Sequence, residues 1–240
     1  MRSQPDPVMA LVAPHLDGFT LLQVRRARRA TLLQRVEQRS ELSHGDIVRL
    51  VALDAGLTRR TATRLGTVLD LLHFGVDLAD NLADEDEDRR AGRRYHELYR
   101  DIPRATLIAL PALLVAAALT ELAAHDRGDA LRRTTRALGL ATHGQGLAPS
   151  HTLRARLVSG AVGALYALPL WLGPRRAHAD QVERWGVSLA TWAHLRASTD
   201  PRDQAREAAA RRRLEAAWPR TPVFVRGALS REKLLGPALV

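Results

Sequence analysis

The sequence predicts an all-α fold built as a single domain. Apolar residues recur at helical spacing along nearly the whole chain, whereas the Val and Ile alternation typical of strands never extends beyond a few residues. The chain has 240 residues, of which 46% are hydrophobic, enough for one core of ordinary size. We expect a helical domain over residues 18–217, preceded by a loose segment, 1–17, and followed by an irregular tail, 218–240.

Helix boundaries in the first part of the chain follow from capping residues and glycines. Residues 1–17 contain three prolines and predict a frayed start. A helix over 19–40 alternates apolar positions with a basic face. Ser43 predicts the cap of a second helix that ends at Gly56, and Thr58 predicts the start of a long third helix.

Turn and proline signals divide the second part of the chain. The predicted helices are Pro103–His125, Ala130–Gln145, Arg156–Gly173 and Pro201–Ala217. The first of them contains Thr106–Leu119, whose apolar composition imitates a membrane span. Pro111 interrupts this stretch and Glu121 closes it before about twenty apolar residues are reached, so we expect a buried core helix and no membrane segment.

One stripe of the long third helix carries titratable side chains. The stripe consists of His73, Asp77, Asp80 and Asp84. These residues are four, three and four apart, which places them on one helix face. Carboxylates one turn apart repel each other, and a packed helix tolerates them mainly where a cation neutralises them. Arg89 and Arg90 follow at once and suit bidentate capture of phosphate oxygens. The stretch therefore predicts a diphosphate site that uses Mg²⁺.

Two other interpretations of this stretch were weighed. The first is a charged, solvated helix end followed by a basic loop. The spacing alone favours this interpretation and the diphosphate site about equally. A calcium-binding loop is disfavoured, because Arg89 stands where the turn glycine belongs and Tyr95 stands where the bidentate Glu belongs.

The same stretch resembles the first aspartate-rich region of the trans-isoprenyl diphosphate synthases, the polyprenyl synthetase family. His73 precedes Asp80 by seven residues, residues 80–84 fill the family's Asp-Asp-x-x-Asp, and Arg89 lies nine residues after Asp80. The match is divergent, because Asn81 replaces the second Asp and Ala91 is inserted before the glycine.

The resemblance implies an antiparallel helical barrel or bundle of the isoprenoid synthase type. It assigns Asp80 and Asp84 as catalytic residues and Mg²⁺ ligands. It assigns substrate diphosphate binding to Arg89, Arg90, His73 and Gln145, the last from a Gly-Gln-x-x-Asp motif in which Ala148 replaces the Asp. A homodimer, or a heterodimer with a related synthase, is implied as well.

Several other motifs of that family are missing. His44 and Arg49 stand near the expected Gly-Lys-Arg, and Arg154 and Arg156 stand near the expected Lys-Thr. Downstream of Trp185-Gly186, Asp200 alone remains of the second aspartate-rich motif, and an N-cap before Pro201 explains it equally well. Each group of this kind in a catalytic site contributes roughly two orders of magnitude to the reaction rate, so their combined loss should leave little synthase activity.

Three functions therefore remain open at this point. The first is a divergent prenyltransferase that condenses an allylic prenyl diphosphate head to tail with isopentenyl diphosphate. The second is a non-catalytic protein, either a prenyl diphosphate binder or a regulatory partner subunit of an intact synthase. The third is a helical scaffold whose charged runs are only surface.

Composition further limits the partners, metal sites and cellular location that we expect. The formal net charge is +10 and is carried almost wholly by Arg, since Lys233 is the single Lys. Only 4% of the residues are aromatic and no nucleic-acid recognition motif is evident, so we expect no nucleic-acid partner. The chain has no Cys, which excludes disulfides and thiolate metal sites. No signal peptide is evident, and we expect a cytoplasmic location.

Overall fold

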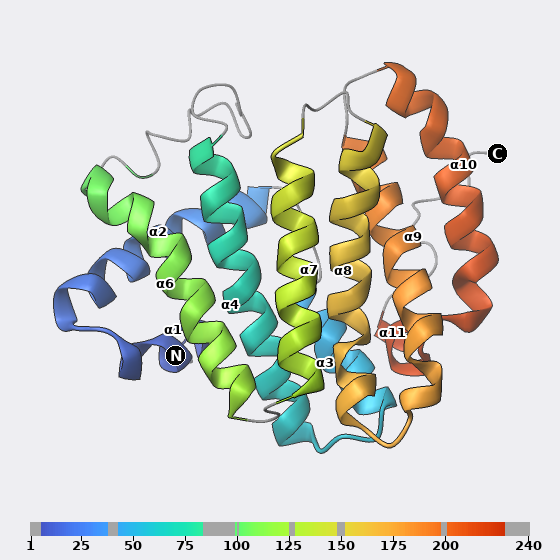
Figure 1. Cartoon of the computed structure of the whole chain (residues 1–240), viewed down its shortest axis with the longest axis horizontal. Helices are drawn as coiled ribbons and strands as arrows, with labels where there is room; N and C mark the ends of the chain where they lie inside the picture. Colours follow the sequence, from blue (N-terminus) through green and yellow to red (C-terminus); the bar gives the residue numbers. More distant parts are fainter. Residues whose placement is uncertain are drawn as a thin grey trace. The chain divides into compact units, whose positions relative to one another are not determined.

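The computed structural model describes residues 6–37, 43–83, 99, 101–124, 128–147, 152–197 and 201–228 (Figure 1). All elements in these ranges are α-helices or short 3₁₀ helices, with no strand among them, so the predicted all-α class is confirmed. The chain divides into two compact units. Unit 1 comprises Met1–Asp46 and Gly66–His125, and unit 2 comprises Ile47–Leu65 and Asp126–Val240.

The predicted capping residues mark the ends of helix α3, and the long helix α4 follows it. Helix α3 spans His44–Asp54 and helix α4 spans Arg59–Ala83, so both contribute residues to each unit. Ser43 caps α3, since its Oγ accepts a hydrogen bond from the Asp46 N–H at 3.0 Å. Gly56 follows α3 at φ +82°, a left-handed conformation that favours glycine.

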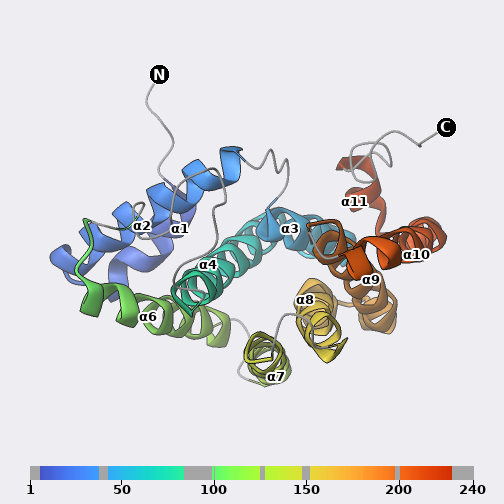
Figure 2. The same cartoon turned by 90° about the horizontal axis from the view of Figure 1, so that it is seen from above.

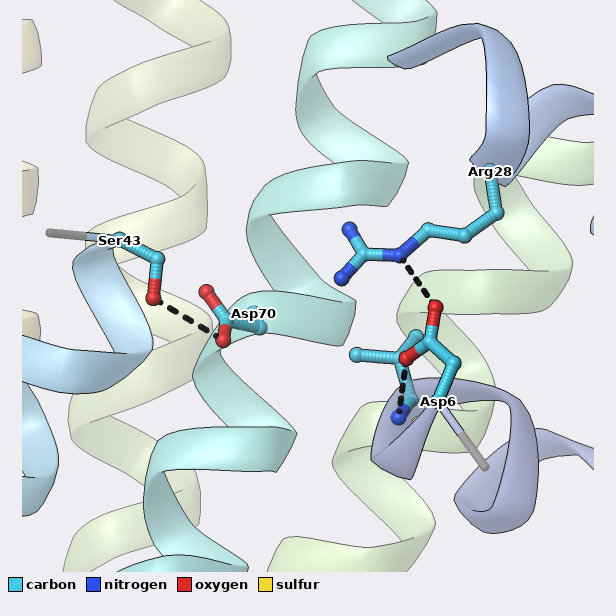
Figure 3. A network of polar contacts seen from close by, with 5 residues as sticks. Asp6, Arg28, Ser43 and Asp70 are labelled. Carbon is cyan, nitrogen blue, oxygen red and sulfur yellow. Dashed lines mark hydrogen bonds and ion pairs between the residues drawn. The ribbon is translucent and has the colours of Figure 1, made fainter. Parts of the chain in front are cut away.

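Unit 1 begins with helical structure where the sequence predicted a frayed start. Its elements are α1 (Pro7–Val12), η1 (Ala13–His15), α2 (Gly18–Glu37), the first turn of α3, most of α4, and α6 (Arg104–Ala123). Asp6 caps α1 by accepting from the Val8 N–H at 2.9 Å. Its second oxygen accepts from Nε of Arg28 on α2 at 3.1 Å (Figure 3). The Arg28 guanidinium also lies 5.5 Å from the Phe74 ring centroid, so α1 is held by a half-buried ion pair that local sequence does not show.

Helix α6 is buried on one face only, which corrects the expectation of a fully buried helix. Leu107, Leu110 and Leu114 are at most 8% exposed. Ile108, by contrast, is 60% exposed and lies on the opposite side of the helix. The helix contacts α4 through Gly75, where an added Cβ would lie 3.2 Å from the Pro111 carbonyl oxygen.

Unit 2 is a row of helices that follow one another in sequence and in space (Figures 1 and 2). Its elements after α4 are α7 (Asp129–Gln145), α8 (Thr152–Leu172), η3 (Arg176–His178), α9 (Ala179–Ala197), α10 (Pro201–Ala217), η4 (Trp218–Arg220) and α11 (Val223–Ala228). Helices α8 and α9 approach closely at Gly163 and Gly186, where a Cβ on Gly186 would lie 2.9 Å from the Gly163 Cα. Residues 218–228 are not the irregular tail predicted from sequence, because η4 and α11 pack there with Val225 fully buried.

Two described helices are long and apolar enough to cross a membrane, judged by length and composition alone. They are Arg104–Ala123 and Leu153–Leu172. In the structure, 39% and 44% of the apolar 18-residue stretch of each helix is buried. Core helices of soluble proteins share this length and composition.

Candidate functional site

The described part of the stripe predicted on the long helix, His73, Asp77 and Asp80, lies on α4 and is partly ordered by a contact between His73 and Asp77. His73 Nδ1 lies 3.0 Å from Asp77 Oδ2, one helical turn away. The two side chains are 28% and 35% exposed, so both remain reachable from solvent. Phe74 and Leu78, on the other face of the helix, are buried and anchor α4 in unit 1. The His73–Asp77 pair is therefore a fixed, half-exposed polar group on a packed helix.

A second imidazole, from α3, joins this pair. The rings of His44 and His73 lie 4.1 Å apart between centroids, with 31° between their planes. The first turn of α3 is held at this place by Asp70 of α4. The Asp70 carboxylate accepts a hydrogen bond from Ser43 Oγ at 3.1 Å (Figure 3). It also accepts one from the Gly45 N–H at 3.1 Å.

Gly45 explains why α3 and α4 can come so close. A Cβ at this position would lie 2.2 Å from the Gly66 carbonyl oxygen and 2.5 Å from the Asp70 carboxyl carbon. Backbone atoms cannot yield to such a contact, so only glycine fits. Sequence reasoning missed the roles of Ser43 and Asp70 here. The available signal was that Asp70 lies three residues before His73 and thus on the same helix face.

The predicted metal ligands are only partly within the described residues. Asp80 lies half-buried in the last turn of α4, whereas Asp84, Arg89 and Arg90 lie outside the described residues. Across the described ranges, no three His, Asp or Glu side chains gather closely enough to hold a metal ion. Asp77 is moreover committed to His73. The described residues thus fit Mg²⁺ only in part, as a single helix-end carboxylate that needs further oxygens.

Gln145, the remaining predicted ligand residue, lies in unit 2 at the end of α7. Its side-chain oxygen accepts a hydrogen bond from Arg154 Nη2 at 2.8 Å, and Arg154 Nη1 donates to the Leu147 carbonyl at 3.4 Å. The guanidinium is therefore held by the α7–α8 turn, close to where the resemblance expects a Lys-Thr pair.

His194, near the end of α9, completes this group, which we call the Arg154 cluster (Gln145, Arg154, His194 and Asp203). Burial lowers the pKa of His194 below its ordinary value, the Asp203 carboxylate on α10 opposes that shift, and Arg154 adds to it. A lowered pKa leaves the imidazole neutral at pH 7. The cluster thus holds one fixed guanidinium near the position where the resemblance expects a Lys-Thr pair, and it includes the Asp203 carboxylate. Asp200, which alone remains of the expected second aspartate-rich motif, lies outside the described residues.

Comparison with known proteins identifies the fold. No family model matches the chain, and no curated protein sequence is similar to it. Among solved structures, the crystal structure of the geranyl diphosphate synthase small subunit from Antirrhinum majus is similar, with a TM-score of 0.57. The match covers 84% of this chain and 86% of that one at 14% sequence identity. The chain has an isoprenoid synthase-like fold. At this identity the similarity extends to the fold and not to an activity.

Proposed function

We propose that this protein is a non-catalytic partner subunit of a prenyl diphosphate synthase. The missing second set of carboxylates is the observation that carries this proposal. Departure of a diphosphate requires cations on both sides of the leaving group, held by carboxylates. Asp200 alone remains of the second set of carboxylates that the resemblance expects, and within the described residues no three His, Asp or Glu side chains gather to hold a metal ion. The chain therefore lacks half of the groups that ionisation of a diphosphate requires.

The structural neighbour supports the same assignment by its own description, since it is a small subunit of a geranyl diphosphate synthase. For this chain we infer a corresponding role, in which the subunit pairs with a synthase that carries both aspartate-rich motifs. A cytoplasmic location is part of the proposal.

An exposed apolar stripe on α6 offers a surface for such a partner. Ala105, Ile108, Ala112 and Ala116 lie three or four residues apart and are all exposed. Small side chains on one helix face permit close approach of a helix from the partner. Ile108, which is 60% exposed, would fill a recess in the partner's surface. We propose this stripe as part of the pairing surface.

The α4 stripe supports a second property, binding of a prenyl diphosphate to the subunit itself. Asp80 and Asp84 would hold Mg²⁺, which neutralises diphosphate charge when bound, while Arg89 and Arg90 would hold phosphate oxygens. His73, whose ring packs against His44 of α3, is on the same half-exposed face of α4 as Asp80, and its imidazole supports this role.

The test combines this chain with a complete synthase from the same organism. Pyrophosphate release and product chain length would be measured for each protein alone and for the mixture, with geranyl and isopentenyl diphosphates as substrates. We expect no release from this chain alone, a stable complex, and an altered rate or product in the mixture. The Ile108→Glu variant should weaken the complex. Turnover by the chain alone would refute the non-catalytic assignment, and an unchanged synthase without complex formation would refute the partner role.

Ligand binding is tested separately by calorimetric titration with geranyl diphosphate, with and without Mg²⁺. Binding that requires Mg²⁺ and is lost in the Asp80→Ala/Asp84→Ala double variant supports the α4 site. Binding that survives this double substitution would place the ligand elsewhere.

A further inference from the structure

A pocket in unit 2 shares no lining residue with the α4 stripe or with the Arg154 cluster. It has a volume of about 250 Å³ and is bounded by the end of α3, the α8–η3–α9 turn, and the η4–α11 segment. All of its lining residues belong to unit 2. The volume is just below the range of about 300–1,000 Å³ typical of sites for drug-sized molecules, so the pocket suits a smaller ligand.

The floor of this pocket is apolar. Val51 of α3, Leu170 of α8 and Val182 of α9 line it and are 0%, 3% and 4% exposed. Val223, at the start of α11, also lines the pocket but is 65% exposed. A large exposed apolar side chain next to an apolar floor is a surface that a short hydrocarbon group would cover favourably.

The upper part of the pocket is cationic. Arg175, His178 and Arg226 line it from η3, the turn before it, and α11, and all three are exposed. Asp54 is the single carboxylate among the lining residues, and another group in the structure already engages it. Two guanidiniums that line one pocket suit the oxygens of a phosphate or carboxylate, since each can donate two hydrogen bonds.

Thr221 provides an independent indication of a ligand. It lines the pocket, is 2% exposed, and has a buried Oγ1 with no hydrogen-bond partner within the described residues. A buried hydroxyl without a partner is unfavourable, and native proteins rarely keep one unless a water or ligand satisfies it. Thr221 lines the pocket while its hydroxyl is closed off from solvent, so a bound head group would engage it once the side chain turns toward the pocket.

We propose that this pocket binds a small amphiphilic anion, with a compact oxyanion head on a short apolar chain. The head lies between Arg175 and Arg226 within reach of Thr221, and the chain covers Val182 and Val223. The site is distinct from the one in the proposed function and does not depend on it. A phosphate monoester and a short-chain carboxylate share this chemistry.

The full-length chain would be titrated with butyl phosphate, butyrate, inorganic phosphate and butanol at about 0.15 M salt, where distant surface charges are screened. Binding would be measured by calorimetry. We expect butyl phosphate to bind about tenfold more tightly than inorganic phosphate, because its chain buries apolar surface, and butanol not to bind measurably. The response to butyrate distinguishes the two head groups.

Variants locate the binding. Arg175→Gln/Arg226→Gln should weaken butyl phosphate binding by about tenfold or more. Arg184→Gln/Arg212→Gln removes the same charge from exposed positions outside the pocket and should have no effect. Thr221→Val should weaken binding severalfold while the protein remains folded.

Other outcomes would overturn the proposal. No binding of any of these anions at about 10 mM would exclude the site. Equal losses in the two arginine variants would show that the net charge of the protein, and not this pocket, attracts the anion. Butanol binding as tightly as butyl phosphate would show a purely apolar pocket.

Discussion

Asp70 is the residue whose removal most directly tests how α3 is fixed to α4. Its carboxylate accepts one hydrogen bond from the Ser43 hydroxyl and one from the Gly45 amide at the start of α3. The same contact sets the position of His44 against His73. We therefore expect Asp70→Ala to lower the free energy of unfolding and to separate the two imidazole rings.

The magnitude follows from the two bonds. A hydrogen bond to a charged group contributes about 1.5–3 kcal/mol, and both bonds here are 3.1 Å long and only half-buried. Values at the lower end give a loss of about 3 kcal/mol for Asp70→Ala. Ser43→Ala removes one of these bonds together with the cap of α3, which corresponds to about 2 kcal/mol. Because the two substitutions share a bond, their combined effect should fall short of the sum by about 1 kcal/mol.

Urea unfolding followed by circular dichroism measures these losses, and nuclear magnetic resonance of the His44 and His73 ring protons reports the stacking. Asp180→Ala is the matched control, since Asp180 is an exposed carboxylate in the first turn of α9. It should cost at most about 1 kcal/mol, the contribution of a charge at a helix N-terminus. A loss for Asp70→Ala no larger than this, or strict additivity with Ser43→Ala, would refute the bridging role of Asp70.

Four further substitutions test packing, burial and titration. Gly163→Ala should destabilise the protein by about 3 kcal/mol in urea unfolding, because its Cβ would lie 2.5 Å from Val187 Cγ2 and 2.9 Å from the Val187 amide nitrogen. Gly139→Ala, with nothing within 4 Å of its Cβ, should instead stabilise α7 by up to about 1 kcal/mol; equal effects would refute the α8–α9 contact. Thr221→Val removes a buried hydroxyl without a described partner and should raise the free energy of unfolding by about 1 kcal/mol, whereas a loss would reveal a bond to that hydroxyl. Burial lowers the pKa of His194, so the unfolded chain takes up the proton first and stability is lost as pH falls below the ordinary value. Thermal melts from about pH 7.5 to about pH 5 should show a smaller loss in His194→Gln than in the wild type, and equal losses would contradict the burial of this imidazole.

The helices that were predicted well are those whose boundaries depend on neighbouring residues. The predicted helix Pro201–Ala217 is confirmed, as are the cap at Ser43 and the glycine end at Gly56. Each of these signals acts within a few residues. Residues 7–15 and 218–228 were predicted wrongly, because their short helices depend on partners distant in the chain, such as the Asp6–Arg28 pair, 22 residues apart. Short segments of this kind lack the length to form helices by themselves.

Helical spacing was sufficient to place His73, Asp77 and Asp80 on one face of α4, and the structure contains that face. It could not show that His44 lies against His73, because this depends on a Gly45 contact with Gly66, which is distant in sequence. Whether Asp84, Arg89 and Arg90 complete a diphosphate site stays a prediction.

The α8–α9 contact and the Arg154 cluster, both in unit 2, differ in how strongly packing constrains their residues. The α8–α9 contact depends on Gly163 and Gly186 and leaves no space for larger residues. The Arg154 cluster, at one end of the same helices, is half-exposed and depends on side-chain hydrogen bonds that another polar residue could replace. Substitutions there cost little stability, whereas substitutions at the glycines cost several kcal/mol, on the order of a quarter of the stability of a typical domain. The constraint on the α8–α9 contact comes from packing, and the chain shares its fold with the structural neighbour at 14% identity. On α4, by contrast, the His44–His73–Asp77 group is fixed by the Gly45–Gly66 backbone contact as well as by side chains, so packing constrains this polar group more strongly than the Arg154 cluster.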